Sequence, residues 1–231
     1  MSLAIRSRQP EQMDAEDLDP VVYARILHDL SQVNGLTLAR LATLRFLGRA
    51  LGDRGTFRLL DVGYGQGDML RAIAHWAERR GFVAELVGID LNPNSAPAAR
   101  AATPAGLAID YRTGDYADLA GGDFDLIISS LVAHHMNDAQ LVAFLRFMEE
   151  QAAIGWMIND IRRDAFAHFG FPLLARIMGW HRIVREDGTL SIARGFRAPE
   201  WTPYLEEADI APGTARVVRR FPFRLCVERL R

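Results

Sequence analysis

The stretch 60-LDVGYGQGDML-70 decides the fold of this 231-residue chain. An apolar run ends in Asp61, three glycines alternate with other residues, and a helix is expected to begin near residue 67. A glycine-rich turn between a strand and a helix brings backbone close to a ligand at the carboxyl end of a parallel sheet. The stretch therefore predicts a small-molecule site at that edge of a sheet.

The spacing and the charge of this turn distinguish it from a dinucleotide site. The dinucleotide pattern G-x-G-x-x-G would need glycine at position 68, where the sequence has Asp68. Asp61 and Asp68 flank the turn, and two carboxylates would repel a pyrophosphate. The backbone at Gly63, Gly65 and Gly67 is therefore expected to approach a ligand that carries positive charge, such as an amino group or a sulfonium.

Short apolar runs alternate with helical segments along the chain. The runs lie at 57–62, 83–90, 107–113, 123–130 and 153–160, and helices are expected at 67–80, 94–102, 138–151 and 199–208. This alternation predicts a mostly parallel sheet with helices on both faces. Two strands within 215–231, joined at Phe221-Pro222, predict a hairpin that adds an antiparallel strand. We expect one α/β domain with a seven-stranded sheet.

Four parts are expected within this single domain of residues 1–231. Residues 1–54 form a helical cap with helices at 18–32 and 36–52, 55–161 the cofactor-binding core, 162–198 a helical insertion, and 199–231 the last helix and strands. The aromatic stretch 165–180 predicts a roof over an acceptor pocket, with a plain core or dimer-contact helix as the alternative. Tyr23 and Asn34 either close over the ligand from the other side or only pack.

Composition excludes several kinds of chemistry. All 27 basic residues are arginine, so no lysine is present for a Schiff base or a Walker-type phosphate site. The net charge of −2 and the scattered arginines give no reason to expect a nucleic-acid partner. The single cysteine, Cys226, predicts a small core residue and fits a reducing compartment, so we expect a cytoplasmic protein. No uninterrupted apolar stretch reaches the ~20 residues of a bilayer span, so stable membrane insertion is not expected.

Two further carboxylates follow the next predicted strands. Asp90, in 88-GIDLN-92, can accept hydrogen bonds from both hydroxyls of a ribose. Asp115, in 114-GDY-116, can accept from the exocyclic amine of an adenine, with Tyr116 or Leu91 beside the ring. Together with Asp61 and the glycine turn, these acids at successive strand ends indicate one shared ligand site.

These motifs carry a resemblance to a known family. The stretches 59-LLDVGYGQGDML-70, 87-VGIDLN-92, 113-TGDY-116 and 124-FDLIISSLVAHHM-136 resemble the successive motifs of the class I S-adenosylmethionine-dependent methyltransferases. The resemblance covers about residues 56–160 and implies a Rossmann-like domain, with S-adenosylmethionine as cofactor and S-adenosylhomocysteine as product. It also implies that Asp61 and Gly63 hold the methionine end, and that Ser129 or Ser130 lines the cofactor floor. Tyr64 departs from the small residue or cysteine of many members, and its role cannot be derived from the sequence.

A looser resemblance extends beyond this core. The N-terminal helix pair, 134-HHMND-138, 158-INDIRR-163 and 187-DGTLSIARGF-196 resemble a bacterial small-molecule group related to the ubiquinone and menaquinone methyltransferases. This likeness implies a small-molecule acceptor without fixing its identity.

Candidate catalytic residues follow the fourth and fifth strands. His134 and His135 are expected where the acceptor arrives, and a histidine with an ordinary pKa of about 6.5 can act as a base near neutral pH. The alternative is that the pair caps the helix at 138 or packs beneath the loop. Asp160 is either a third catalytic residue or a structural anchor paired with Arg162 or Arg163.

The sequence thus predicts a methyltransferase acting on a small aromatic, quinone-like or polyketide-like acceptor, by O- or C-methylation and without a metal site. One alternative is a protein of the same fold that binds the cofactor without catalysis. Another is an NAD(P)-dependent oxidoreductase, which Asp68 disfavours. The sequence leaves open whether the protein forms a homodimer. His181 and Asp187, in the insertion, are expected at the surface.

Overall fold

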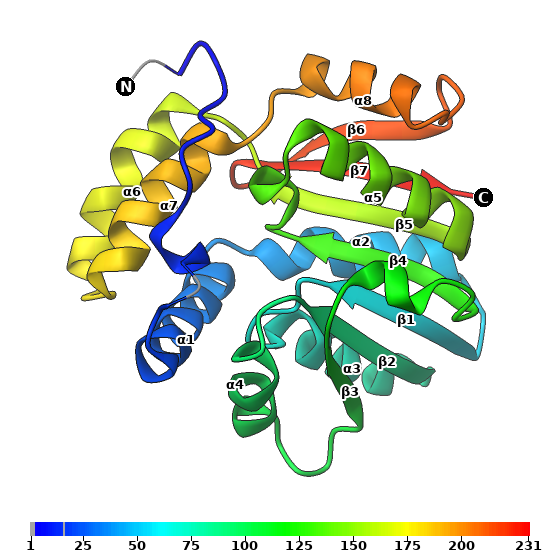
Figure 1. Ribbon diagram of the computed structural model, residues 1–231. Helices are drawn as coiled ribbons and strands as arrows, with labels where there is room; N and C mark the ends of the chain where they lie inside the picture. Colours follow the sequence, from blue (N-terminus) through cyan, green and yellow to red (C-terminus); the bar gives the residue numbers. More distant parts are fainter. Residues whose placement is uncertain (1–2, 16) are drawn as a thin grey trace.

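The computed structural model describes residues 3–15 and 17–231. Its centre is a seven-stranded sheet of order β3-β2-β1-β4-β5-β7-β6 (Figure 1). The strands are β1 (Thr56–Val62), β2 (Val83–Asp90), β3 (Ile109–Thr113), β4 (Phe124–Ser130), β5 (Ala152–Ile161), β6 (Ala215–Arg220) and β7 (Arg224–Leu230). Strands β1 to β5 pair in parallel, whereas β7 runs antiparallel to both β5 and β6. The predicted mostly parallel sheet with an antiparallel C-terminal hairpin is confirmed.

Helices cover both faces of this sheet. They are α1 (Pro20–Leu36), α2 (Ala39–Leu51), α3 (Asp68–Arg80), α4 (Ser95–Ala102), α5 (Asp138–Gln151), α6 (Ala165–Ile177), α7 (Arg182–Arg194) and α8 (Trp201–Glu207). One apolar core joins α5 and α8 to the sheet around Trp156 and Trp201, and a second joins α2, α3 and α4 to the opposite face around Phe46. Successive strand residues point to opposite faces, so β1 contributes Leu60 to the first core and Leu59 to the second.

A helical cap lies beyond the carboxyl ends of the parallel strands. It consists of α1, α6 and α7, which Figure 1 shows gathered at that end of the sheet. Ile26 of α1 packs against Ala175, Ile183 and Val184 in a third apolar cluster. The N-terminal segment, residues 3–15, runs along α7, where the Ser7 amide donates to the carbonyl of Ala193 at 3.0 Å. The cap therefore joins the beginning of the chain to the insertion that follows β5.

Two further expectations concern the single cysteine and membrane insertion. Cys226 of β7 is fully buried, as its alternating context predicts. Across the described ranges, no helix combines the length and apolarity needed to cross a membrane.

Candidate active site

The glycine turn follows β1, at the carboxyl end of a central strand. Gly63, Gly65 and Gly67 have φ values of 77°, 54° and 75°, in the left-handed region that favours glycine. A Cβ at Gly63 would lie 2.3 Å from Val132 Cγ2, and one at Gly67 would lie 2.4 Å from the Tyr111 hydroxyl. Positions 63 and 67 therefore both need glycine, because the backbone is left-handed there and a Cβ would collide with a neighbouring side chain.

Tyr64, whose role the sequence left open, packs on β2 beneath the turn. It is buried, its hydroxyl donates to the carbonyl of Arg112 at 3.1 Å, and its ring centroid lies 5.0 Å from that of Tyr111. A Cβ at Gly88 would lie 2.6 Å from Tyr64 Cδ1. The large side chain at position 64 thus fills the space that Gly88 leaves.

Asp61 is an unpaired buried acid. It is 1% exposed, and neither of its carboxylate oxygens has a hydrogen-bond partner within residues 3–15 and 17–231. Burial, together with the charges of Asp68 and Asp90, raises its pKa well above the ordinary value. Because a buried polar group without a partner is costly, a donor or cation that reaches Asp61 would be bound favourably.

Asp90 ties the glycine turn to the end of β2. Its carboxylate accepts hydrogen bonds from the amides of Gly65 and Asn92, each at 2.9 Å. Burial raises its pKa, although these hydrogen bonds oppose the shift.

Asp68, the first residue of α3, has a cationic partner that the sequence did not reveal. Arg40 Nε lies 2.9 Å from its carboxylate. The sequence placed both carboxylates beside the turn without showing which of them is paired. Asp61 is unpaired, whereas the charge of Asp68 is balanced from α2, 28 residues earlier in the chain.

A cavity of about 1270 Å³ lies between the strand ends and the cap. Of the predicted cofactor residues, its wall includes Gly63, Gly65, Asp68, Asp90, Leu91, Tyr116 and Ser130. Tyr23 and Asn34 line it from α1, and Phe166, Phe171 and Leu174 line it from α6. Ligand pockets typically measure ~300–1,000 Å³, so this cavity has room for a cofactor and an acceptor together.

Four predicted cofactor residues lie outside this wall as the structure describes it. They are Asp61, Gly67, Asp115 and Ser129. Ser129 Oγ donates to the carbonyl of Val62 at 2.9 Å, so this serine holds β4 against β1. Asp115 is exposed and accepts from the Ala117 amide at 2.9 Å, which caps the short helix η2 (Tyr116–Leu119).

The predicted histidines lie in the turn η3 (Ala133–His135), which follows β4, and both line the cavity. Asp160 of β5 holds this turn. Its carboxylate accepts from the His134 amide at 2.8 Å and lies 2.7 Å from His134 Nδ1. Asn137, not a histidine, caps α5 by accepting from the Gln140 amide, so the interpretation of the pair as a helix cap is wrong. The turn instead directs the rings toward β5 and the cavity.

The predicted pairing of Asp160 with an arginine is also wrong. Arg162 pairs with Asp164, and Arg163 pairs with Glu200. Asp160 instead pairs with His134, because η3 lies directly against the end of β5. Asp160 therefore positions a histidine instead of lining the cavity itself.

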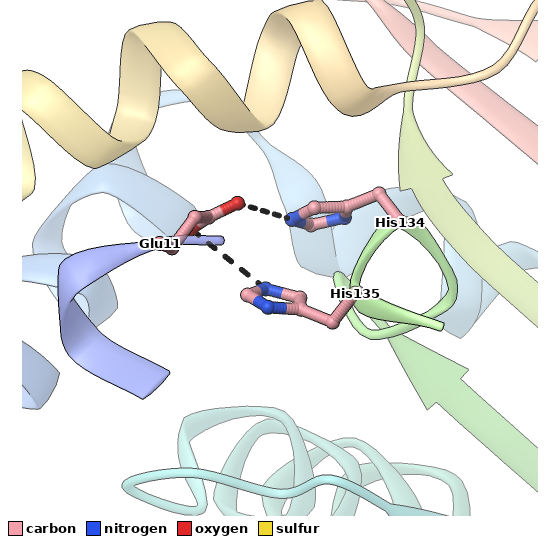
Figure 2. Close-up of side chains that lie close together, drawn as sticks. All are labelled: Glu11, His134 and His135. Atoms are coloured by element: carbon pink, nitrogen blue, oxygen red, sulfur yellow. Dashed lines mark ion pairs between the residues drawn. The ribbon is translucent and has the colours of Figure 1, made fainter. Parts of the chain in front are cut away.

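Glu11 enters the site from the N-terminal segment and faces both rings (Figure 2). Its carboxylate oxygens are 3.6 Å from His134 Nε2 and 3.9 Å from His135 Nε2. His135 Nδ1 lies 2.9 Å from Asp14. Burial alone would lower the pKa of His135, but the hydrogen bond to Asp14 and the charges of Glu11 and Asp14 raise it. Sequence reasoning missed both acids, which lie more than 100 positions from the histidines.

Asp187 is buried and lines the cavity, so its predicted surface position is wrong. It accepts hydrogen bonds from the amides of Gln12 at 3.1 Å and Met13 at 2.9 Å. The N-terminal segment covers α7 and buries this acid, which in turn holds the segment that carries Glu11. His181 is half-buried and caps α7 by accepting from the Ile183 amide.

Arg224 places a buried positive charge on the cavity wall. Its Nη2 donates to Thr37 Oγ1 at 3.0 Å, while Nη1 is buried without a hydrogen-bond partner among the residues that the structure covers. Burial lowers its pKa, against the opposing effect of Asp160. A guanidinium in this setting suits a carboxylate.

Comparison with known proteins agrees with this geometry. Residues 59–152 match a family model described as "Methyltransferase domain". This part of the chain is therefore similar to a methyltransferase domain. Several solved structures that share the fold hold S-adenosylmethionine (SAM) or S-adenosylhomocysteine (SAH). No curated protein matches the chain.

Solved structures share the fold of this chain at low sequence identity. Magnesium protoporphyrin IX methyltransferase from Synechocystis PCC 6803, with bound SAH, is 18% identical with a TM-score of 0.57, over 85% of this chain and 84% of that one. The mitomycin 7-O-methyltransferase is 17% identical with a TM-score of 0.65, over 96% of this chain. Human N-acetylserotonin methyltransferase in complex with SAM is 13% identical with a TM-score of 0.61, over 92% of this chain. The alignments span 61% of the mitomycin enzyme and 56% of the human one.

Proposed function

We propose that the protein transfers a methyl group from SAM to an oxygen of a small, largely apolar acceptor. The observation that carries the proposal is a shared cavity. Buried carboxylates and the glycine turn lie at one part of it, and a histidine–carboxylate cluster lies at another. Its size exceeds that of a typical single-ligand pocket, which supports two ligands side by side.

The residues at the glycine turn fit the cofactor. Asp61 lies outside the cavity wall, but among the described residues its two oxygens have no partner, so they can accept from the methionine amino group when the cofactor fills the glycine turn. Arg224 Nη1, also without a partner there, offers a donor for a carboxylate. Asp90 suits the ribose hydroxyls, and Leu91 and Tyr116 flank the place for an adenine. Bound there, SAM supplies an electrophilic methyl group on a sulfonium. The chain's own contribution is to hold the two reactants in line, which can supply ~7–11 kcal/mol of the barrier.

The cluster of Glu11, His134 and His135 suits an acceptor that must lose a proton. The rings present Nε2 toward the cavity because Asp160 and Asp14 hold both Nδ1 atoms. A hydroxyl placed there can give up its proton to a ring nitrogen, which leaves an oxygen anion for attack on the methyl carbon. Aromatic and aliphatic side chains from α6 complete an apolar enclosure that suits a flat acceptor.

Binding and turnover of paired variants test this proposal. We expect SAM and SAH, but not NADH, to raise the melting temperature. Asp90→Ala should abolish SAH binding, whereas His135→Ala should retain SAH binding and reduce turnover in a screen of phenols and hydroquinones with labelled SAM. Stabilisation by NADH alone, or equal turnover of the two variants, would overturn the assignment. Product analysis separates O-methylation from C-methylation of the same ionised acceptor.

A further inference from the structure

The side-chain cluster of Glu11, His134 and His135 has the composition and spacing of a metal site. The three residues each offer one ligand atom, and these atoms all lie within 4.8 Å of one another (Figure 2). We propose that the cluster binds a divalent transition-metal ion of the zinc type at the acceptor end of the cavity. This departs from the sequence-based expectation of a protein without a metal site.

The three ligand atoms, within 4.8 Å of one another, are near enough to close on such an ion. Zinc–ligand bonds of ~2.0–2.1 Å at tetrahedral angles place neighbouring ligand atoms about 3.3 Å apart. The Glu11 oxygens lie 3.6 and 3.9 Å from the Nε2 atoms of His134 and His135. These separations are too long for hydrogen bonds, and a contraction of the cluster by up to about 1 Å would bring its atoms to ligand spacing. Two neutral imidazoles and one carboxylate are a ligand set common at zinc and non-haem iron sites.

Each ring is oriented by a second carboxylate. Asp160 lies 2.7 Å from His134 Nδ1, and Asp14 lies 2.9 Å from His135 Nδ1. An Nδ1–H that donates to a carboxylate leaves the lone pair on Nε2, which is the arrangement of metal-bound histidines. Asp160 and Asp14 therefore orient both Nε2 atoms toward Glu11. Carboxylate partners of this kind normally accompany the histidine ligands of a zinc site.

Glu11 is buried in a way that favours a cation. It is 4% exposed, and in the described part of the chain its Oε1 has no hydrogen-bond partner. Arg194 Nε lies 3.6 Å from Oε1 but donates to the carbonyl of His134 at 3.0 Å. Oε2 accepts from Ser191 Oγ at 2.9 Å, which fixes the carboxylate in place. Oε1 is thus held beside the rings and available to an ion.

The cluster leaves one side open to the cavity, since all three residues line it. Three protein ligands and an open fourth position are typical of catalytic zinc sites. With both Nε2 atoms bound to it, an ion there would take over the role of the rings: it would lower the pKa of an acceptor hydroxyl, whose proton would leave to solvent, and stabilise the oxygen anion. This role rests on the proposed function. Metal binding itself does not depend on that function.

Metal binding is tested on the full-length protein. Co²⁺ titrated into metal-free protein should give the visible spectrum of a tetrahedral site, and Zn²⁺ should displace it and raise the melting temperature. Glu11→Gln and His135→Ala should remove the Co²⁺ spectrum. Asp14→Asn, which alters only an orienting partner, should weaken Co²⁺ binding roughly tenfold or more. Retained SAH binding confirms that each variant is folded.

A matched control is the exposed pair of His75 and Glu78, whose side chains lie 3.9 Å apart on α3. His75→Ala with Glu78→Gln should leave Co²⁺ binding unchanged. If Glu11→Gln and His135→Ala bind Co²⁺ as the unaltered protein does, or if the unaltered protein gives no Co²⁺ spectrum, the metal site is refuted. Asp90→Ala separates this failure from that of the proposed function, because it should lose SAH while keeping the Co²⁺ spectrum.

Discussion

Replacing Gly63 by alanine tests the contact between the glycine turn and the loop that carries the histidines. The φ of 77° costs an alanine about 1–2 kcal/mol. The new Cβ would also lie 2.3 Å from Val132 Cγ2, and overpacking of this kind costs a further 1–3 kcal/mol, roughly. We therefore expect Gly63→Ala to lower the free energy of unfolding by about 2–5 kcal/mol. Val132 is two residues before His134, so the variant should also weaken SAH binding and turnover.

A double-mutant cycle measured by urea unfolding separates the two costs. Val132→Ala removes the clashing methyl groups, so Gly63→Ala combined with Val132→Ala should recover about 1–3 kcal/mol relative to the sum of the single variants. Gly81→Ala is the matched control, because Gly81 has a φ of 73° and a Cβ added there would meet no atom of the described residues within 4 Å. It should show the backbone cost alone. Additivity of the Gly63 and Val132 variants within about 0.5 kcal/mol would refute the contact.

Buried groups give three further predictions. The pKa of Asp61 is raised, and a cationic ligand binds its ionised form. SAH affinity, measured by calorimetry, should therefore rise with pH as Asp61 ionises and fall as the pH drops through the raised pKa. Asp61→Asn should weaken binding and flatten this dependence, and an unchanged profile would contradict the role of Asp61. Tyr64→Phe loses the hydrogen bond to the Arg112 carbonyl and should lower the free energy of unfolding in urea by about 0.5–1.5 kcal/mol. SAH affinity should be retained, and a loss of SAH affinity would mean that Tyr64 touches the cofactor. Burial raises the pKa of Cys226 to about 12, so a thiol reagent at pH 8 should modify it only as fast as the sheet opens, and fast labelling of the folded protein would disprove its burial.

Local patterns were enough to predict most of the fold. The alternation of apolar runs with helical segments located β1 to β5, because the hydrophobic periodicity of each element depends only on its own residues. The hairpin at the end of the chain was readable from two alternating stretches around Phe221-Pro222. The boundary between the two helices of the insertion was not predicted. The short turn at Gly179 that separates α6 from α7 lies inside the apolar stretch 165–180, whose pattern does not mark a break.

The partners within the site were not predictable, because they come from distant parts of the chain. Asp61 and Asp68 have the same residue type and flank the same turn, yet only Asp68 meets an arginine, which comes from α2. Glu11 is one acid in an acid-rich N-terminal stretch, and nothing in its immediate sequence separates it from its neighbours. Its position beside the two histidines depends on how the N-terminal segment lies on α7, and this was visible only in the structure.

The route of the N-terminal segment has a consequence for the order in which the protein is assembled during synthesis. Domains generally begin to fold as they leave the ribosome, N-terminal parts first. Glu11 leaves the ribosome 180 positions before Ser191, which holds it. The glycine turn and β4 can form long before α7 exists, so the nascent chain can build the glycine turn while Glu11 still lacks the helix that holds it. Folding of the last third of the chain therefore closes the reaction site.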